Sequence, residues 1–171
     1  KEHLVKEKPD YGMIIIRLGG PAYRIGMGGG SASSRDHSEN DKEANYNAVQ
    51  RGDPEMENKV NRVIRTCVNL GSDNPIISIH DQGAGGLANV VKEIAYPNGA
   101  VIYLDNVTLG DVSMKPLDIW CSEFQESDVI LVENVELIEI ICKKENICCD
   151  ILGTITNTGN ISVWYKDEQL I

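Results

Sequence analysis

The chain has 171 residues, of which 42% are apolar and 25% charged, and these fractions are typical of a globular protein rather than a disordered one. Its 16 basic and 26 acidic side chains give a net charge of −10, which argues against nucleic acid or a membrane surface as the main partner. No apolar run approaches the roughly 20 residues of a membrane span. The charged N-terminus has no signal-peptide pattern and no initiator Met, which predicts a segment of a longer protein.

The cysteine pattern indicates a reducing compartment. The five cysteines are an odd number and include no C-x-x-C pair, so neither a metal cluster nor a disulfide framework is expected. We therefore predict free thiols and a cytoplasmic location. A redox role for the adjacent Cys148 and Cys149 is the weaker alternative, because nothing nearby in sequence would lower a thiol pKa.

The first third of the chain alternates one strand with long polar segments. The apolar run at 13–18 predicts a buried strand, closed by Gly-Gly-Pro. A glycine- and serine-rich loop follows over 22–34, and the polar segment 35–48 is predicted to be an exposed loop. Asp53 then fits the N-cap of a helix over 54–70, since a proline and two acidic residues follow it.

The remaining chain alternates strands with helices. Short apolar runs and helical periodicity predict strands at 76–79, 100–104, 128–132, 150–156 and 161–165, and helices at 87–95 and 136–144. The turn sequence at 157–160 predicts that the last two strands form a hairpin. This order indicates a single domain over 1–171 of the α+β class, an α/β sandwich with a mixed sheet and helices packed on one side.

The most informative motif is His-Asp-Gln-Gly-Ala-Gly-Gly at 80–86, between a predicted strand and a predicted helix. Asp81 at the strand end could hold Mg²⁺ on a phosphorylated ligand, since Mg²⁺ prefers carboxylate oxygens. The alternative is that Asp81 only caps the turn and the glycines only permit the bend. His80 is a weak candidate for a general base, and a hydrogen-bonded structural role is the more common fate of such a residue.

A second candidate is the glycine-rich loop, in which backbone amides and hydroxyls could surround a phosphate. The alternative is a flexible linker. The residues that would contact the phosphate are Gly28, Gly29, Gly30, Ser31, Ser33 and Ser34.

Two further polar segments contain residues that their local structure does not require. Gln50 and Arg51 precede the helix start, and a Gln amide can bind an amide or formyl group while an Arg can bind a phosphate. The stretch 119–128 contains a polar turn with Glu123, Gln125 and Glu126 before a buried strand, and a solvated loop is its simplest interpretation.

Taken together, four motifs in this order resemble the phosphoribosylformylglycinamidine synthase family of purine biosynthesis, in its large single-chain form. The motifs are LGGPAYRIGMGGGSASS (18–34), VQRGDPEMENK (49–59), HDQGAGGL (80–87) and IWCSEFQES (119–127). Bacterial members more often read Ser-Gln-Glu-Arg in the last motif, so Phe124 and Ser127 depart from that pattern.

The resemblance implies a fold and a reaction. The chain is expected to be the C-terminal half of the first aminoimidazole-ribotide-synthetase-like module, and the ATP-binding half of that module and the glutaminase domain are expected elsewhere in the enzyme. In the family, ATP phosphorylates the amide oxygen of formylglycinamide ribonucleotide (FGAR), and ammonia from glutamine displaces the phosphate. The resemblance implies Mg²⁺ and ATP as ligands, Asp81 as a metal ligand, and substrate contacts from Gln50, Glu123, Phe124 and Gln125. The isolated chain is expected to be inactive.

Two alternatives differ from this interpretation. The chain could belong to another ATP-dependent phosphotransfer enzyme of the same superfamily, or it could be a non-catalytic binding or scaffold module. The motif at 49–59 favours the phosphoribosylformylglycinamidine synthase family over other members of the superfamily.

Overall fold

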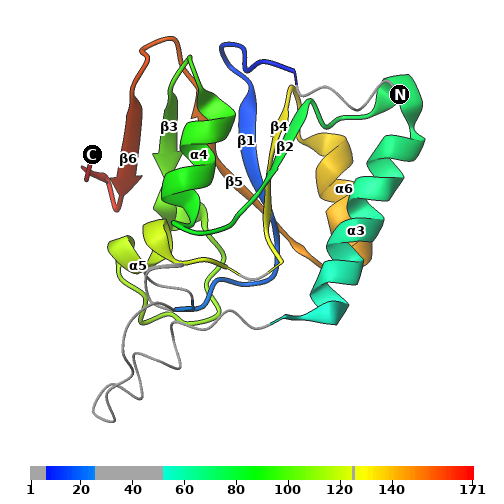
Figure 1. The fold of residues 1–171 in the computed structure, drawn as a ribbon, viewed down its shortest axis with the longest axis horizontal. Helices are drawn as coiled ribbons and strands as arrows, with labels where there is room; N and C mark the ends of the chain where they lie inside the picture. The colour runs from blue at the N-terminus through cyan, green and yellow to red at the C-terminus, as the bar shows by residue number, and fades with distance from the viewer. Residues whose placement is uncertain (1–6, 26–51, 125) are drawn as a thin grey trace.

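The computed structural model describes residues 7–25, 52–124 and 126–171, which form one mixed β-sheet with helices against it (Figure 1). The strands are β1 (Ile14–Gly19), β2 (Ser78–Asp81), β3 (Ala100–Tyr103), β4 (Asp128–Val132), β5 (Cys148–Ile155), β6 (Ile161–Tyr165) and β7 (Glu168–Gln169). The helices are α3 (Pro54–Asn69), α4 (Leu87–Ala95), α5 (Pro116–Cys121) and α6 (Glu136–Glu145). The strand order is β2-β4-β1-β5-β3-β6-β7, so the mixed sheet and the α+β class are confirmed.

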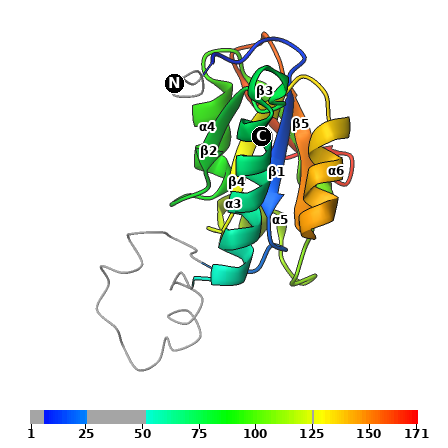
Figure 2. The same ribbon diagram turned by 90° about the vertical axis from the view of Figure 1, so that its right-hand side faces the viewer.

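Apolar side chains cover both faces of the sheet, which corrects the prediction that helices pack on one side only. Successive residues of a strand point to opposite faces. Accordingly, Ile15 of β1 joins a buried cluster with α4 and α5, whereas Ile16 joins a second buried cluster with α3 and α6. Figure 2 shows α4 and α6 on opposite sides of the central strands. The continuous apolar sequences of β1 and β4 are explained by this burial on both faces.

The first helix begins as its sequence predicts. The Asp53 side chain accepts a hydrogen bond from the backbone N–H of Met56 at 3.0 Å, so the N-cap is confirmed. The apolar stripe of α3 buries Val60, Val63 and Cys67. The pattern fails at Val68, which is 40% exposed although it lies at helical spacing. The first turns of α3 lie beside the end of β2 and the start of β4, since Glu57 and Val60 line the same pocket as Asp81 and Asp128.

The predicted hairpin of β5 and β6 is wrong. β3 lies between these two strands, antiparallel to β5 and parallel to β6. The turn at 157–160 therefore joins two strands that are not neighbours in the sheet. It passes over the start of β3, where Gly159 donates its backbone N–H to the carbonyl of Asn98. The insertion of β3 is possible because Gly153 leaves no side chain above Val101 in the neighbouring strand.

Two differences from the prediction affect the functional region. β2 begins at Ser78, two residues later than expected, so His80 and Asp81 belong to the strand and do not follow it. Helix α5 was not predicted, since its six residues are too few to show periodicity, and it leads directly into the polar segment before β4. Within the described part of the chain, no helix is both long and apolar enough to cross a membrane.

Candidate functional site

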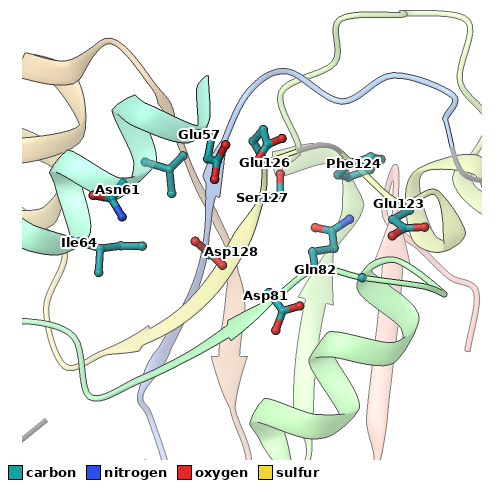
Figure 3. Close-up of a pocket in the computed structure, with 12 residues that line it drawn as sticks. Glu57, Asn61, Ile64, Asp81, Gln82, Glu123, Phe124, Glu126, Ser127 and Asp128 are labelled. Carbon is teal, nitrogen blue, oxygen red and sulfur yellow. The ribbon is translucent and has the colours of Figure 1, made fainter. Parts of the chain in front are cut away.

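A pocket of about 500 Å³ lies where β2 ends and β4 begins, between α3 and the segment that leads into β4 (Figure 3). Five of its lining residues are acidic, and no Lys, Arg or His of the described residues lines it. This charge favours a cation, or a ligand whose negative groups are neutralised by one. The lining residues are Glu57, Val60, Asn61, Ile64, Asp81, Gln82, Gly83, Glu123, Phe124, Glu126, Ser127 and Asp128.

Asp81 and Asp128 form the centre of the acidic group. They are direct partners in the antiparallel pairing of β2 with β4, and such partners have Cβ atoms about 5 Å apart. Asp81 is exposed and Asp128 is half-buried. Burial raises the pKa of Asp128 to about 6, and the negative charges of Asp81 and Glu126 add to this effect. The pair therefore brings two carboxylates together in a place where a positive charge would stabilise both.

This donor set fits Mg²⁺, which proteins commonly hold through one or two carboxylates and ligand phosphates. Asp81 and Asp128 could supply the carboxylates. The described residues contain no group of three or more side chains that could hold a metal on their own. Any metal bound here would consequently need further oxygens from a ligand or from another part of the protein.

The segment before β4 contributes two further acidic residues. Glu126 has a positive φ of 49°, and its Oε1 accepts a hydrogen bond from the backbone N–H of Asp53 at 3.3 Å. This bond joins the segment to the start of α3. Burial raises the pKa of Glu123 above its ordinary value. The backbone N–H of Glu123 donates to the carbonyl of Ile25 at 3.0 Å, so this bond links the segment to the residues that follow β1.

Gln82 is a lining residue that the sequence analysis did not single out, although it lies inside the quoted motif. Its backbone N–H donates to the carbonyl of Ser127 at 2.9 Å, and its side-chain Nε2 donates to the carbonyl of Ser122 at 3.2 Å. Its Oε1 and the hydroxyl of Ser122 are buried and have no partner among the described residues. Asp128 was also missed as a site residue, because only the strand register reveals that it faces Asp81.

Phe124 and His80 are also predicted site residues in the described part of the chain, but their surroundings differ from those of Glu123. Phe124 lines the pocket, yet its side chain is only 2% exposed and belongs to the core cluster beside α4. His80 does not line the pocket. Its Nδ1 lies 3.4 Å from a carboxylate oxygen of Glu93 on α4, an arrangement typical of the structural alternative.

The other predicted contacts lie outside the described residues. They are Gln50, Gln125 and the six residues of the glycine-rich loop, and the same holds for Arg51 and the loop 35–48. The structure therefore brings together Asp81, Glu123 and Phe124 of the predicted set.

The raised pKa of Asp128 predicts that Asp128→Asn stabilises the metal-free chain only at neutral pH. Between about pH 4 and pH 6 the folded state binds more protons at this position than the unfolded state, whose Asp pKa is about 3.9, so stability falls as pH rises. Removing the charge should increase the free energy of unfolding by about 1–2 kcal/mol at pH 7.5 and by nothing at pH 4. Thermal unfolding without metal measures this.

Glu133→Gln is the matched control, since it removes one exposed carboxylate just after β4 and outside this pocket. An Asp128→Asn gain that is equal at both pH values would contradict the expected pKa.

The fold is that of an α+β domain, in which a mixed sheet is covered on both faces and an acidic pocket lies where β2 ends and β4 begins. The chain belongs to the family of AIR synthase related proteins, C-terminal domain, which matches residues 11–166.

Curated relatives carry a narrower name. The chain is 53% identical over 163 residues to the probable chloroplastic/mitochondrial phosphoribosylformylglycinamidine synthase of Arabidopsis thaliana, and 47% identical over 163 residues to phosphoribosylformylglycinamidine synthase of Homo sapiens. Each match covers 94% of this chain but 12% of the relative, so the chain spans about an eighth of the length of these relatives.

Solved structures agree on the fold. The chain matches T. maritima PurL complexed with FGAR with a TM-score of 0.85 at 24% identity, over 97% of this chain and 27% of that one. It also matches the HypE–HypF complex with a TM-score of 0.60 at 18% identity, over 94% of this chain and 52% of that one. At these identities the matches establish the architecture alone.

Proposed function

We propose that this chain is a segment of a phosphoribosylformylglycinamidine synthase, the ligase that converts FGAR, ATP and glutamine into formylglycinamidine ribonucleotide, ADP, phosphate and glutamate. The observation that carries the proposal is the identity of about half the residues to enzymes of that name over nearly the whole chain. An acidic pocket formed by three of the motif regions is consistent with this assignment.

The proposed reaction requires that the amide oxygen of FGAR be activated and that the charge of the phosphates be screened. An amide oxygen is a poor leaving group, and its phosphorylation by ATP turns it into one that ammonia can displace. Phosphates bound here would bring negative charge beside five carboxylates, and a divalent cation between them would reduce the repulsion. We propose that Asp81, with Asp128 beside it, holds Mg²⁺, which would supply charge screening during phosphoryl transfer.

The substrate contacts divide between described and undescribed residues. We propose that Glu123 and the buried wall at Phe124 face the glycinamide part of FGAR, together with Gln50 and Gln125. The proposed phosphate contacts in the glycine-rich loop are Gly28, Gly29, Gly30, Ser31, Ser33 and Ser34. The pocket position of Glu123 beside Gln82 supports the first part of this assignment.

Two further parts of the enzyme are proposed to lie outside these 171 residues. The N-terminal ATP-binding half of the module and a glutaminase domain would belong to other parts of the same polypeptide, since the relatives are much longer. A cytoplasmic location is proposed from the five cysteines, none of which is in a disulfide. A relative named for plastids and mitochondria shows that other compartments occur among similar proteins.

The test is an ammonia-dependent assay with FGAR and Mg-ATP. A full-length polypeptide containing this chain should form the amidine, whereas the 171-residue chain alone should form none. Product from the isolated chain would show that the active site is complete within it. No product from the full-length protein, with its substrates bound, would favour the scaffold alternative.

A further inference from the structure

Arg17 of β1 is a charged residue with no exposed surface, and it lies directly behind the pocket wall. Its Nε donates to Oδ2 of Asp150 on β5 at 2.9 Å, and its Nη2 donates to the same oxygen. Asp150 is itself fixed, because its carboxylate also accepts from the backbone N–H and the hydroxyl of Thr108, at 3.0 and 2.7 Å. One side of the guanidinium is therefore held rigidly by the sheet.

The other side of the guanidinium contacts the pocket wall. Nη1 donates to the hydroxyl oxygen of Ser127 at 3.0 Å and to the carbonyl of Gly20 at 2.8 Å. The guanidinium carbon also lies 5.4 Å from the centre of the Phe124 ring, within the range of a cation–π interaction. Phe124 and Ser127 both line the pocket, so Arg17 supports two wall residues without lining the pocket itself.

A planar guanidinium suits this position because its donors are fixed in one plane, and a lysine ammonium cannot reproduce them. A buried ion pair often adds little net stability, since both charges lose their water. The pair between Arg17 and Asp150 is therefore better explained by orientation than by stabilisation. The described residues of the wall segment between α5 and β4 form no helix or strand, so their positions depend on contacts such as those from Gln82 and Arg17.

We infer that Arg17 is a positioning residue for the substrate-binding wall of this pocket. Anchored by Asp150, it fixes Ser127 and Phe124 relative to the end of β1, so that the wall is already formed before the ligand binds. This inference rests on the proposed function for its effect on substrate binding, but the positioning itself does not depend on the reaction.

The first experiment measures the wall directly by hydrogen exchange of the 122–128 backbone amides. Ser127→Ala removes the contact from Arg17 and should speed their exchange at least threefold. Thr66→Ala is the matched control, because it also removes one hydroxyl hydrogen bond, from Oγ1 of Thr66 to the carbonyl of Arg62 at 2.7 Å on α3. Neither residue is bonded to Arg17 or lines the pocket, so exchange in the wall should stay unchanged. The Ser127→Ala variant avoids the loss of a buried charge, so it should fold.

The second experiment is a double-mutant cycle in the full-length enzyme. Arg17→Lys and Ser127→Ala should each raise KM for FGAR about tenfold with kcat within twofold, and the double variant should be no worse than Arg17→Lys alone. Thr66→Ala should leave KM unchanged. If Ser127 contacted the substrate on its own, the two effects would multiply, and that result would overturn the inference.

The two readouts separate the possible failures. Unchanged exchange in Ser127→Ala, or equal acceleration in Thr66→Ala, would overturn the role of Arg17 whatever the reaction is. Faster exchange in a full-length protein that makes no amidine would support the role of Arg17 and reject the proposed function.

Discussion

Asp81→Asn is expected to lower ATP-dependent amidine formation by about 100-fold or more in the full-length enzyme. A metal ion that screens a transferring phosphoryl group stabilises the transition state by several kcal/mol, and each 1.36 kcal/mol is tenfold in rate. An amide keeps the shape of the carboxylate but loses its charge, so the metal would lose its principal protein ligand. Asp81 is exposed, so the substitution should leave the thermal transition intact.

The assay should compare initial rates over a range of Mg²⁺ concentrations, with Asp73→Asn as the control. Asp73 is also exposed and lies before β2, away from this pocket. Excess Mg²⁺ should restore part of the activity of Asp81→Asn, because a weakened site can still be filled. Wild-type activity of Asp81→Asn at limiting Mg²⁺ would exclude this residue as a metal ligand.

Gly86→Ala is expected to be the most destabilising single-methyl substitution in the glycine turn, at about 3 kcal/mol. Gly86 has φ 59° and ψ −144°, a conformation close to one that is essentially restricted to glycine. A Cβ there would also collide with the backbone carbonyl oxygen of Ser122, which flanks the pocket wall. Backbone strain and overpacking each cost about 1–3 kcal/mol, and neither the helix start nor the wall can move alone.

Gly71→Ala is the matched comparison. Gly71 has nearly the same φ, 61°, but a Cβ there would meet nothing within 4 Å. It should cost only about 1 kcal/mol, from the left-handed backbone alone. At roughly 2–4 °C per kcal/mol for a chain of this size, Gly86→Ala should lower Tm by roughly 6–12 °C and Gly71→Ala by roughly 2–4 °C. Equal losses would mean that the contact with Ser122 contributes nothing.

The local elements could be predicted because their signals lie within a few residues of one another. Helix α3 follows from the Asp53 cap, the proline after it and an apolar stripe at helical spacing. Strand β4 follows from a run of apolar residues, and its bounds agree with the prediction. The candidate position of Asp81 at the end of a buried strand also needed only neighbouring residues, and the structure places it in a pocket.

The site was only partly predictable. Glu123 could be chosen because it lies in a polar turn before a buried strand, and the family resemblance gave it a role. Asp128 carried no such signal, since an acidic residue at the start of a strand is ordinary. Its importance comes from the register that places it opposite Asp81 and from the burial that raises its pKa.

By itself the sequence determined most of the helices and strands, though not α5 or β7, and it singled out the motif that contains Asp81. Tertiary structure alone decided that β3 separates β5 from β6, that helices cover both faces, and that Arg17 lies behind the pocket wall. The physical reason is the range of the interactions. Caps and periodicity act between residues three or four apart, whereas strand pairing and buried ion pairs can join residues far apart in the sequence, such as Arg17 and Asp150, which are 133 positions apart.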